Sequence, residues 1–480
     1  MIELREYQND SVQLIRAAFT SKHKRVVLCL PTGSGKTVVF SEMVRLAAER
    51  GTRTLVLTDR TELFTQTFKA MGRVGITPQR IHAKGNYTID PFALVTVGMV
   101  ETLKRRITKG AALDPELIII DEAHRGNFTK VLDIFPKARV IGATATPVGK
   151  HFFKYYTEIV QNIDIPDLID KGFLSECRAF QMQADLSDLV TKAGEYTDAS
   201  LLQHYDNQQL FDGVIEQYKE KANGTKAIVF NVNIKHTENM TKAFNDAGIA
   251  SECVTSKTPT DERERILRAF HMGLFPVLNN CGILTTGYDE PTIETVIMNR
   301  ATKSLPLWLQ CCGRGSRVID GVKERFTVLD FGMNHDQHGM WAEPRTWKIT
   351  KPREKKQDVA PVKECPKCYS MIFASARRCR YCEYEFPFEE NELSQGKMVE
   401  VTPKVPPTLT GKRISDLSLI ELIELEASKT YKPSFIWRVV RASGKESIRE
   451  YARMKGHSSG WAWRQEKEIE NSSFKDYILR

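Results

Sequence analysis

The chain has 480 residues, of which 41% are hydrophobic and 27% charged, with a formal net charge of +9 at pH 7. This composition is typical of a soluble globular protein with room for about two to four domains. No apolar run is long enough to cross a bilayer, and Met1–Arg5 lack the pattern of a secretory signal, so we expect a cytoplasmic protein without a membrane partner. The positive charge permits a polyanionic partner but would serve solubility equally well.

The stretch Leu30–Thr37, with the sequence LPTGSGKT, predicts a phosphate-binding loop. An apolar run, Val26–Leu30, precedes it, and a segment with helical spacing of apolar residues follows. In such a strand–loop–helix unit the backbone N–H groups face an anion, Lys36 supplies a charge for the β/γ-phosphates and Thr37 a hydroxyl for Mg²⁺. Leu30 stands where a glycine is usual, so Pro31–Gly33 must shape the turn by other means.

Short apolar runs alternate with amphipathic segments twice along the chain, which predicts two parallel sheets covered by helices. The strands expected in the first block are Val26–Leu30, Thr54–Leu57, Ala93–Val97, Leu117–Ile120 and Val140–Ala143. Those expected in the second are Ala227–Phe230, Pro276–Leu278, Thr295–Met298 and Thr327–Leu329, with helices around 236–247, 261–271 and 305–311. Residues 150–224 have no clear period. The second block has no phosphate loop, which suggests that the two blocks share one nucleotide site at their interface.

Two carboxylates, Asp121 and Glu122, follow the buried-strand pattern Leu117–Ile120. Beside a phosphate loop, Asp121 can hold Mg²⁺ and Glu122 can orient and deprotonate the attacking water. The alternative is a helix N-cap. The turn Gly142–Pro147, after the fifth strand, could link the nucleotide site to movement elsewhere.

Arg314 and Arg317 are three residues apart at the end of a short helical segment, so both can project to one side. Facing a γ-phosphate held by the other block, they would form an arginine-finger arrangement. Two exposed surface arginines are the alternative.

In this order the motifs resemble those of the superfamily 2 helicases with a DEAD or DEAH box. The match covers roughly residues 1–335. The matching stretches are Leu4–Gln8 (Q-motif), residues 31–37 (I), Leu55–Gln66 (Ia), Thr96–Gly98 (Ib), Asp121–His124 (II, a literal DEAH), Thr144–Thr146 (III), Ile228–Phe230 (IV), Leu284–Asp289 (V) and Gln310–Arg317 (VI).

The resemblance implies ATP hydrolysis with Mg²⁺ in a cleft between two RecA-like domains, which closes on ATP binding and opens on hydrolysis. Catalysis would rest on Lys36, Glu122, Gln310, Arg314 and Arg317, and Mg²⁺ on Thr37 and Asp121. The implied nucleotide-binding residues are Gln8 (for adenine), Thr32, Gly33, Ser34, Gly35, Lys36, Thr37, Asp121, Gly287 and Asp289. Motifs Ia, Ib, IV and V would line a nucleic-acid track.

Four cysteines form two Cys-x-x-Cys knuckles, Cys365/Cys368 and Cys379/Cys382, and predict a tetrahedral Zn²⁺ site without an open position. Basic and aromatic residues between them suit phosphate contact and base stacking, although a purely structural ribbon is a near-equal alternative. The six other cysteines are expected to be free thiols, because disulfides are rare in cytosolic proteins.

After residue 347 the chain becomes polar and basic, and its tail interleaves aromatic residues with cations. Residues Ile414, Leu417, Ile420 and Leu425 predict a helix with one apolar face. The tail's tryptophans suit the core of a small domain and nucleic-acid contact equally well. The predicted segments are a first RecA-like domain (1–165), a connection (166–224), a second RecA-like domain (225–347), a linker (348–363), a zinc ribbon (364–388) and a basic, aromatic, α-rich or mixed C-terminal domain (410–480).

The zinc knuckles and the tail make the chain similar to the bacterial RadD family, in which ATPase activity is tied to DNA and to single-stranded-DNA-binding protein. The chain is shorter than RadD proteins, has fewer cysteines and carries His124 where they usually have cysteine, as expected of a phage-encoded relative. We therefore expect an ATP-dependent DNA helicase or translocase in repair, recombination or replication. The alternatives are an RNA helicase and a nucleic-acid-binding ATPase switch that separates no strands.

Overall fold

The computed structural model describes residues 3–83, 88–182, 186, 189–192, 194–206 and 208–349. Beyond these it describes 362–364, 367, 371–373, 383–384, 398–401, 417–427, 440, 444–455, 463 and 465–466. The chain divides into two compact units, Met1–Trp341 with Arg345–Glu400, and Ala342–Pro344 with Val401–Arg480. Each unit is described by itself.

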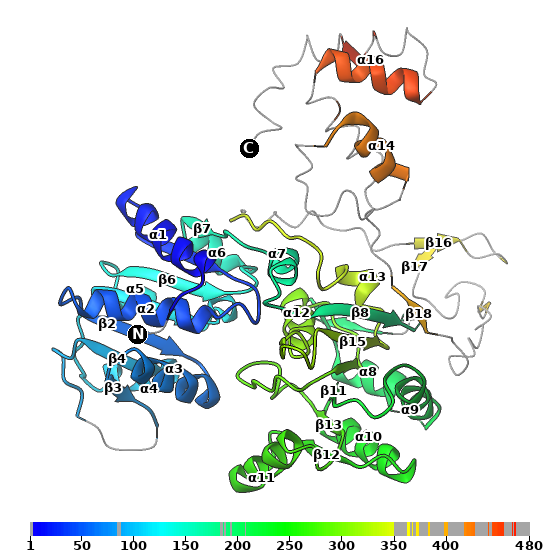
Figure 1. Ribbon diagram of the computed structural model, residues 1–480, viewed down its shortest axis with the longest axis horizontal. Coiled ribbons are helices and arrows are strands. Elements are labelled where there is room, and N and C mark those ends of the chain that lie inside the picture. The colour runs from blue at the N-terminus through cyan, green and yellow to red at the C-terminus, as the bar shows by residue number, and fades with distance from the viewer. Residues whose placement is uncertain are drawn as a thin grey trace. The chain divides into compact units, whose positions relative to one another are not determined.

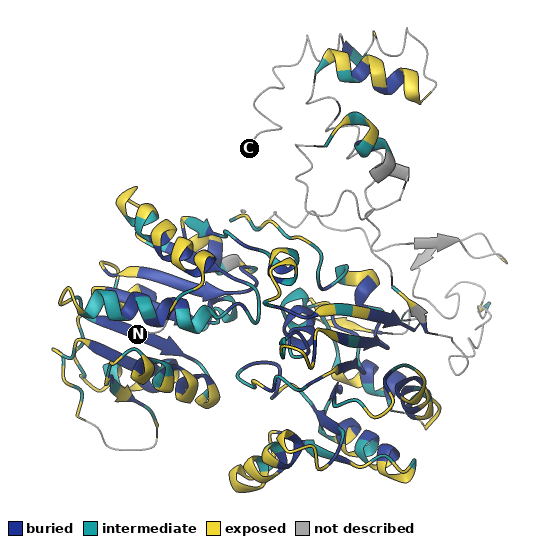
Figure 2. Cartoon of the chain, viewed as in Figure 1, coloured by how far each residue is buried: buried dark blue, intermediate teal, exposed yellow. Residues whose placement is uncertain are grey.

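The first unit begins with a seven-stranded parallel sheet in the order β3-β4-β2-β5-β6-β1-β7 (Figure 1). The strands are β1 Arg25–Cys29, β2 Thr54–Thr58, β3 Gln79–Ile81, β4 Val95–Met99, β5 Leu117–Asp121, β6 Arg139–Thr144 and β7 Glu158–Val160. The central strands are almost wholly buried (Figure 2), as expected of a parallel sheet covered on both faces. Because β1, β6 and β5 are neighbours, the loops that follow them meet at one edge.

The helices of this first sheet follow its strands in alternation. They are α1 Glu6–Thr20, α2 Lys36–Ala48, α3 Thr61–Arg73, α4 Val100–Thr108, the 3-10 turn η1 Ala123–Arg125, α5 Thr129–Ile134 and α6 Lys150–Tyr155. One hydrophobic cluster joins the strands to α4, α5 and α6, while α1, α2 and α3 contact one another in sequence. On β6, a Cβ at Gly142 would lie 2.5 Å from the Tyr156 hydroxyl, so the glycine lets this buried tyrosine pack against the strand.

The second sheet of the same unit also has seven strands, in the order β12-β13-β11-β14-β15-β8-β18. The strands are β8 Glu176–Gln181, β11 Ala227–Phe230, β12 Ser251–Val254, β13 Val277–Asn280, β14 Thr295–Met298, β15 Arg325–Asp330 and β18 Val399–Glu400. All pairs are parallel except β18 with β8. Buried asparagines cross its carboxyl edge, where Asn299 donates to Asn231 at 2.9 Å and Asn231 to Asn279 at 3.0 Å.

The helices associated with the second sheet include the connecting helix α7. They are α7 Ile165–Asp170, α8 Asp198–Tyr205, α9 Gln208–Ala222, α10 Ile234–Asp246, α11 Thr260–His271, α12 Leu305–Cys312 and α13 Asn334–His338. A short antiparallel pair, β9 Thr191–Lys192 and β10 Glu195–Tyr196, precedes α8. One core cluster packs α9 and α10 against β11 and its neighbours.

The predicted fold class, two tandem parallel-sheet α/β domains, is confirmed in these two sheets. Each predicted strand lies within two residues of an observed one, but β3, β7, β8, β12 and β18 of the two sheets were not predicted. The stretch 150–224, expected to be an irregular connection, instead supplies β7 to the first sheet and β8 to the second. The strand β7 has only three residues, and β8 contains several polar residues, so neither forms the apolar run by which strands were predicted. The proposed domain boundaries remain predictions.

An antiparallel pair, β16 Val362–Glu364 and β17 Met371–Phe373, joins the end of the predicted linker to the predicted zinc ribbon. Cys365, Cys368, Cys379 and Cys382 lie outside the described residues. The other six cysteines are free thiols, as predicted.

The second unit contains the helices α14 Leu419–Ala427 and α16 Lys445–Met454, which contact each other. Leu422 is buried but Ile420 is exposed, so the prediction that Ile420 lies on the helix's apolar face was wrong. Ile448 and Tyr451 of α16 are buried, whereas Trp463 is exposed. Among the described residues, no helix is both long and apolar enough to cross a membrane.

Candidate nucleotide site between the two sheets

The predicted phosphate loop lies between β1 and α2, with Lys36 as the first residue of the helix. Gly33 and Gly35 have φ angles of +95° and +82°, a left-handed conformation that is costly for other residues. Pro31 closes the turn, because its carbonyl accepts hydrogen bonds from the Ser34 hydroxyl at 2.7 Å and the Ser34 N–H at 3.2 Å. Leu30 is fully buried and continues the pairing with β6, which explains why this position does not need a glycine.

The ammonium of Lys36 folds back onto the backbone of this loop. Its Nζ donates to the carbonyls of Leu30 at 3.3 Å and Pro31 at 3.4 Å, which are long hydrogen bonds. Thr37 follows on the first turn of α2 and is half-buried. The loop therefore has the cradle, the cation and the hydroxyl that a Mg²⁺-bound triphosphate needs.

Gln8, predicted to read adenine, lies on α1 against the same loop. Its Nε2 donates to the Ser34 carbonyl at 3.0 Å, and its Oε1 accepts from the Arg5 N–H at 3.0 Å. The Tyr7 hydroxyl also donates to the Ser34 carbonyl, at 2.6 Å. The structure thus places Gln8 beside the phosphate loop, and its contact with a base remains a prediction.

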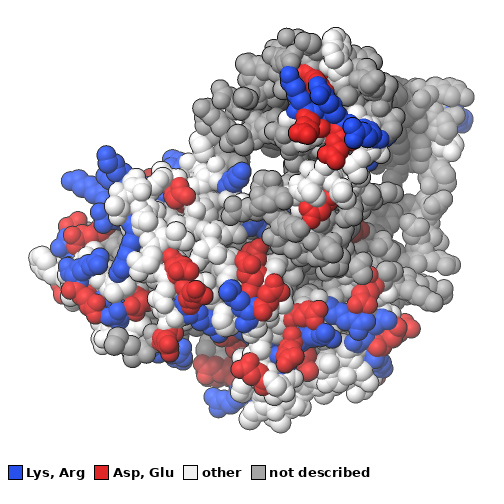
Figure 3. Space-filling model, turned by 45° about the horizontal axis from the view of Figure 1, so that its top comes forward, with Lys and Arg blue, Asp and Glu red and all other residues white. Residues whose placement is uncertain are grey.

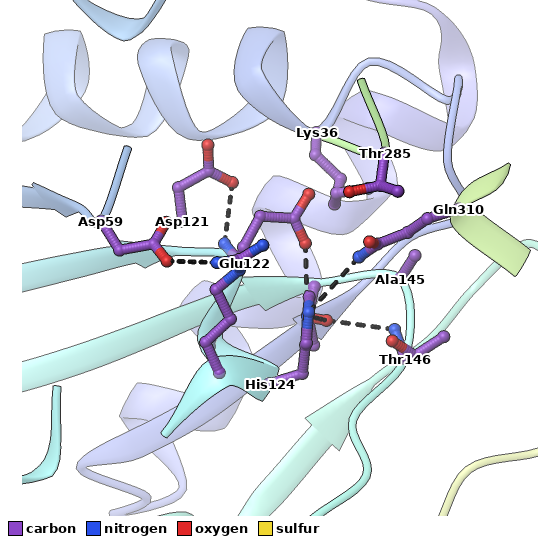
Figure 4. A network of polar contacts seen from close by, with 12 residues as sticks. Lys36, Asp59, Asp121, Glu122, His124, Ala145, Thr146, Thr285 and Gln310 are labelled. Carbon is purple, nitrogen blue, oxygen red and sulfur yellow. Dashed lines mark hydrogen bonds and ion pairs between the residues drawn. The ribbon is translucent and has the colours of Figure 1, made fainter. Parts of the chain in front are cut away.

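Asp121 and Glu122 lie at the carboxyl end of β5, as predicted. Glu122 adopts a left-handed conformation, with φ +52°, and its N–H donates to Asp121 Oδ1 at 3.0 Å (Figure 4). Burial and the Glu122 charge raise the pKa of Asp121, against the lowering effect of Lys36. Burial also raises the pKa of Glu122, but His124 and Lys36 outweigh it and leave that pKa below its ordinary value.

Two adjacent buried carboxylates that repel each other fit a cation, which would let both ionise. Among the described residues no group of three or more His, Cys, Asp or Glu side chains could hold a metal by itself. Mg²⁺ does not need one, because it commonly takes one or two carboxylates together with substrate phosphates and water. Asp121 and Thr37 would hold it in this way.

His124 connects this carboxylate pair to β6 and to the second sheet. Its Nδ1 lies 3.0 Å from Thr144 Oγ1 and 3.3 Å from Glu122 Oε2, while Gln310 Nε2 lies 3.3 Å from its Nε2 (Figure 4). Because the Gln310 amide nitrogen can only donate, the imidazole Nε2 accepts and the Nδ1 carries the proton. One imidazole thus joins three of the predicted motifs.

Arg314 and Arg317 approach the site from the loop after α12. Arg314 is held by backbone carbonyls of the preceding loop: its Nη2 donates to Thr285 at 2.9 Å and its Nη1 to Tyr288. Arg317 Nε donates to Asp289 Oδ1 at 2.8 Å. Burial and Arg317 lower the pKa of Arg314 to about 10, so the guanidinium stays charged at neutral pH.

The arginine loop contacts the phosphate loop directly. A Cβ on Gly33 would collide with Arg317 Nη1, and a Cβ on Gly313 would lie 2.8 Å from Thr32 Cγ2. Among the described residues, Arg317 Nη1 and Arg314 Nε are buried and find no hydrogen-bond partner. Buried donors with unused capacity beside a phosphate cradle fit an anionic ligand.

Gly287 and Asp289, both predicted to bind nucleotide, have different surroundings. Asp289 lies in the site through its ion pair with Arg317. Gly287 instead contacts α3: its carbonyl accepts from Gln66 Nε2 at 2.5 Å, and a Cβ there would lie 3.0 Å from Glu62 Cβ. The structure therefore does not bring Gly287 to the phosphate loop.

Several supporting residues were not predicted from the sequence. Arg125, next to the DEAH residues, pairs with Asp59 after β2 at 2.7 Å, and Ser175 Oγ donates to the Arg317 carbonyl at 2.7 Å. Lys323 is buried beneath the arginine loop. Asp59 follows a buried strand directly, and this position in the sequence could have marked it as a site residue. Nothing in the sequence around Ser175 or Lys323 indicated a place in the site.

Known families match both halves of this site. Residues 1–149 match the family described as "Type III restriction enzyme, res subunit", and residues 208–318 match "Helicase conserved C-terminal domain". The chain is 30% identical over 371 residues to the "51.5 kDa protein" of Lactococcus phage (isolate 7-9), covering 75% of this chain and 78% of that protein. The chain belongs to the superfamily 2 helicases.

Two further relatives of this helicase come from cellular organisms. It is 31% identical over 354 residues to IRC3 of Saccharomyces cerevisiae (68% of this chain) and 25% identical over 369 residues to "DNA 3'-5' translocase XPB2" of Sulfurisphaera tokodaii (66% of this chain). It spans 80% of XPB2 but only 51% of IRC3.

Solved structures share the fold. A fragment assigned to the HsdR subunit of a type I restriction enzyme from Vibrio vulnificus YJ016 has a TM-score of 0.56 at 22% identity, covering 70% of this chain and 67% of that chain. The ATP-dependent Type ISP restriction-modification enzyme LlaBIII, solved bound to DNA, has a TM-score of 0.52 at 17% identity, covering 68% and 27%.

Proposed function

We propose that this superfamily 2 helicase is an ATP-dependent DNA helicase or translocase that hydrolyses ATP between its two sheets. The observation that carries the proposal is the contact of Arg317 with Gly33 of the phosphate loop, together with the bridge from Gln310 to His124. A site whose halves belong to two sheets can turn nucleotide binding and release into relative movement of those sheets.

In this proposal the first sheet binds ATP and activates water. The N–H groups of the loop and Lys36 hold the β/γ-phosphates, and Asp121 and Thr37 hold Mg²⁺, which would neutralise phosphate charge. Glu122 is ionised by virtue of its lowered pKa, so its carboxylate can accept a proton from the attacking water. Glu122 has a left-handed backbone conformation, which is costly for a residue other than glycine and is frequent at functional sites.

The second sheet would supply the charge that stabilises the transition state. Arg317 reaches the phosphate loop, and the Arg314 charge acts on Glu122. Within the described part of the chain, each of the two guanidiniums has a buried N–H without a hydrogen-bond partner. A γ-phosphate would compete with Asp289 for Arg317, and the arginine would exchange its ion pair for the phosphate. Loss of the γ-phosphate would reverse this exchange and loosen the two sheets.

DNA is the substrate we favour, because a sequence relative is named as a DNA translocase and a structural neighbour was solved bound to DNA. Basic and acidic side chains alternate over the described part of the face in Figure 3, so charge alone marks no nucleic-acid path on it. Motifs Ia, Ib, IV and V remain the proposed track.

The test is ATP turnover measured without nucleic acid and with single-stranded, duplex and branched DNA, or RNA. We expect DNA to stimulate turnover and Lys36→Ala to abolish it. No stimulation by any DNA would contradict the proposal, and stronger stimulation by RNA would favour an RNA helicase instead. Strand displacement on forked DNA then separates a helicase from a translocase or an ATPase switch.

The cysteine knuckles and the cellular role are further parts of this proposal. We propose that Cys365, Cys368, Cys379 and Cys382 bind one Zn²⁺, on the strength of their spacing. Metal analysis of the purified chain should find about one zinc per chain, and none would contradict the site.

A role in repair, recombination or replication, and a RadD-like partnership with single-stranded-DNA-binding protein, rest on resemblance and call for a direct binding assay.

A further inference from the structure

A buried lysine, Lys323, lies directly beneath the arginine loop. It is only 4% exposed, and its ammonium contacts no carboxylate among the hydrogen bonds of the described residues. Its Nζ donates instead to three backbone carbonyls: Gly315 at 2.6 Å, Arg317 at 2.7 Å and Pro291 at 3.0 Å. The three N–H donors of one ammonium are thus matched to three acceptors.

The backbone around Lys323 fixes this arrangement. Lys323 pairs with Ile319 through two hydrogen bonds, 2.7 Å and 3.0 Å long, which close a tight hairpin before β15. The loop above is held from other sides as well, because the Ser175 N–H donates to the Ser316 carbonyl at 2.8 Å and the ring of Phe326 packs under Gly315. Lys323 is the group that joins this loop to Pro291, two residues after Asp289.

We infer that Lys323 is a positioning residue, which holds the loop carrying Arg314 and Arg317 so that their guanidiniums face the phosphate loop. The inference rests on the proposed ATPase function. Burying the Lys323 charge among neutral carbonyls costs desolvation free energy, which an apolar side chain of similar length would not cost. Stability of the folded state is therefore a weak explanation for a lysine at this position. A cationic clamp on three carbonyls, in contrast, sets the distance between the motif VI backbone and Pro291, two residues after motif V.

The same geometry predicts a dependence on pH. The charged groups that act on Lys323 are Arg317, Glu290 and Glu294, of which the two glutamates favour the ammonium and Arg317 disfavours it. Burial is the largest influence, and it lowers the pKa of Lys323 to about 8. The neutral amine keeps two N–H groups and turns a lone pair toward a carbonyl, so the clamp weakens as the pH rises through this value.

The experiment compares Lys323→Met and Lys323→Arg with a matched control, Lys226→Met, in the full-length chain with DNA present. Lys226 is a partly buried lysine at the same edge of the sheet, just before β11, and it is also near Glu290 and Glu294. Its Nζ donates to the His271 carbonyl of α11 at 3.0 Å and not to the arginine loop, so the variant removes a similar charge without removing the clamp. We expect Lys323→Met to lower kcat by about 10²-fold with little change in KM for ATP, because a small displacement of catalytic groups costs about that much. Lys323→Arg should recover part of kcat, and Lys226→Met should match wild type.

The pH dependence of kcat tests the positioning role, because a lysine that only stabilised the fold would not change the pH at which kcat is lost. Wild type should lose kcat on the alkaline side near pH 8, and Lys323→Arg should shift that loss upward, because a guanidinium stays charged (pKa above about 12). A kcat within twofold of wild type for Lys323→Met, or an unshifted alkaline loss in Lys323→Arg, would overturn the inference. If Lys323→Met does not fold, the Lys323→Arg profile decides.

Failure of this inference and failure of the proposed function are distinguishable. If wild type hydrolyses ATP and Lys36→Ala does not, while the Lys323 variants behave like wild type, only the positioning role is wrong. If wild type hydrolyses no ATP, the proposed function fails and the inference falls with it.

Discussion

The two halves of the nucleotide site are built in different ways. On the first sheet the functional groups are fixed by local backbone: two left-handed glycines, a helix that begins at Lys36, and carboxylates at the end of β5. On the second sheet Arg314 is held by backbone carbonyls of the preceding loop, and Arg317 by an ion pair with Asp289. Ser175 and Lys323 donate to the Arg317 carbonyl. We call the first half of the site the rigid half, because local backbone conformation places its groups. We call the second half the adjustable half, because a ligand can replace the ion pair between Arg317 and Asp289.

The largest expected effect concerns the adjustable half. Arg317→Ala should lower the rate of ATP hydrolysis by about 10³–10⁵-fold, the range measured for arginine fingers, because it removes a cation from the phosphate loop. Steady-state turnover with DNA measures this, and Arg325→Ala, an exposed arginine paired with Glu176, is the control. Turnover close to wild type would mean that the second sheet does not complete the site.

The next effect concerns the rigid half. Glu122→Gln should lower turnover by about 10²–10⁴-fold, because the amide cannot accept a proton from water. Binding of a fluorescent ATP analogue should persist, since the phosphate loop is intact. Glu116→Gln, just before β5 at the opposite edge of the sheet, should be unaffected. Loss of nucleotide binding together with turnover would assign Glu122 to binding rather than to catalysis.

A glycine exchange tests whether the rigid half depends on backbone conformation or on space. Gly33→Ala and Gly51→Ala both place a side chain at a left-handed position, which costs about 1–2 kcal/mol. A Cβ on Gly33 would meet Arg317, Leu174 and Ser316, whereas one on Gly51 would have no described atom within 4 Å. Both variants should melt earlier, but only Gly33→Ala should lose ATP turnover. Equal turnover in the two would show that the arginine loop does not contact Gly33 during the reaction.

The smallest effect concerns the bridge between the halves. A double-mutant cycle of His124→Ala and Gln310→Ala should give an interaction energy on the order of 1 kcal/mol in DNA-stimulated turnover, as expected for side chains in one hydrogen-bond network. The cycle is read from kcat with and without DNA. Additive single effects would mean that the 3.3 Å contact does not couple the sheets.

The contrast between local backbone and long-range contacts also explains which parts of the fold and of the site could be predicted from the sequence. The strands β11 and β14 were predicted with their observed bounds, because each is a short apolar run between polar turns. The strand β8 was missed because Glu176 and Arg178 interrupt its apolar pattern, and only its place beside β15 makes it part of the sheet. Gly287 was assigned to the nucleotide from its motif, but its place against α3 depends on how the two sheets meet.

By itself, the sequence determined the phosphate loop, the carboxylates after β5 and the order of the motifs, because glycines, strand ends and helix starts act on their immediate neighbours. Only the tertiary structure decided which groups hold the arginines, that His124 joins Thr144 to Gln310, and that Lys323 lies beneath the arginine loop. Apart from the contacts of Lys323 with Gly315 and Arg317, these contacts join residues that are far apart in the chain. The order of the strands, which local sequence does not specify, brings such residues together.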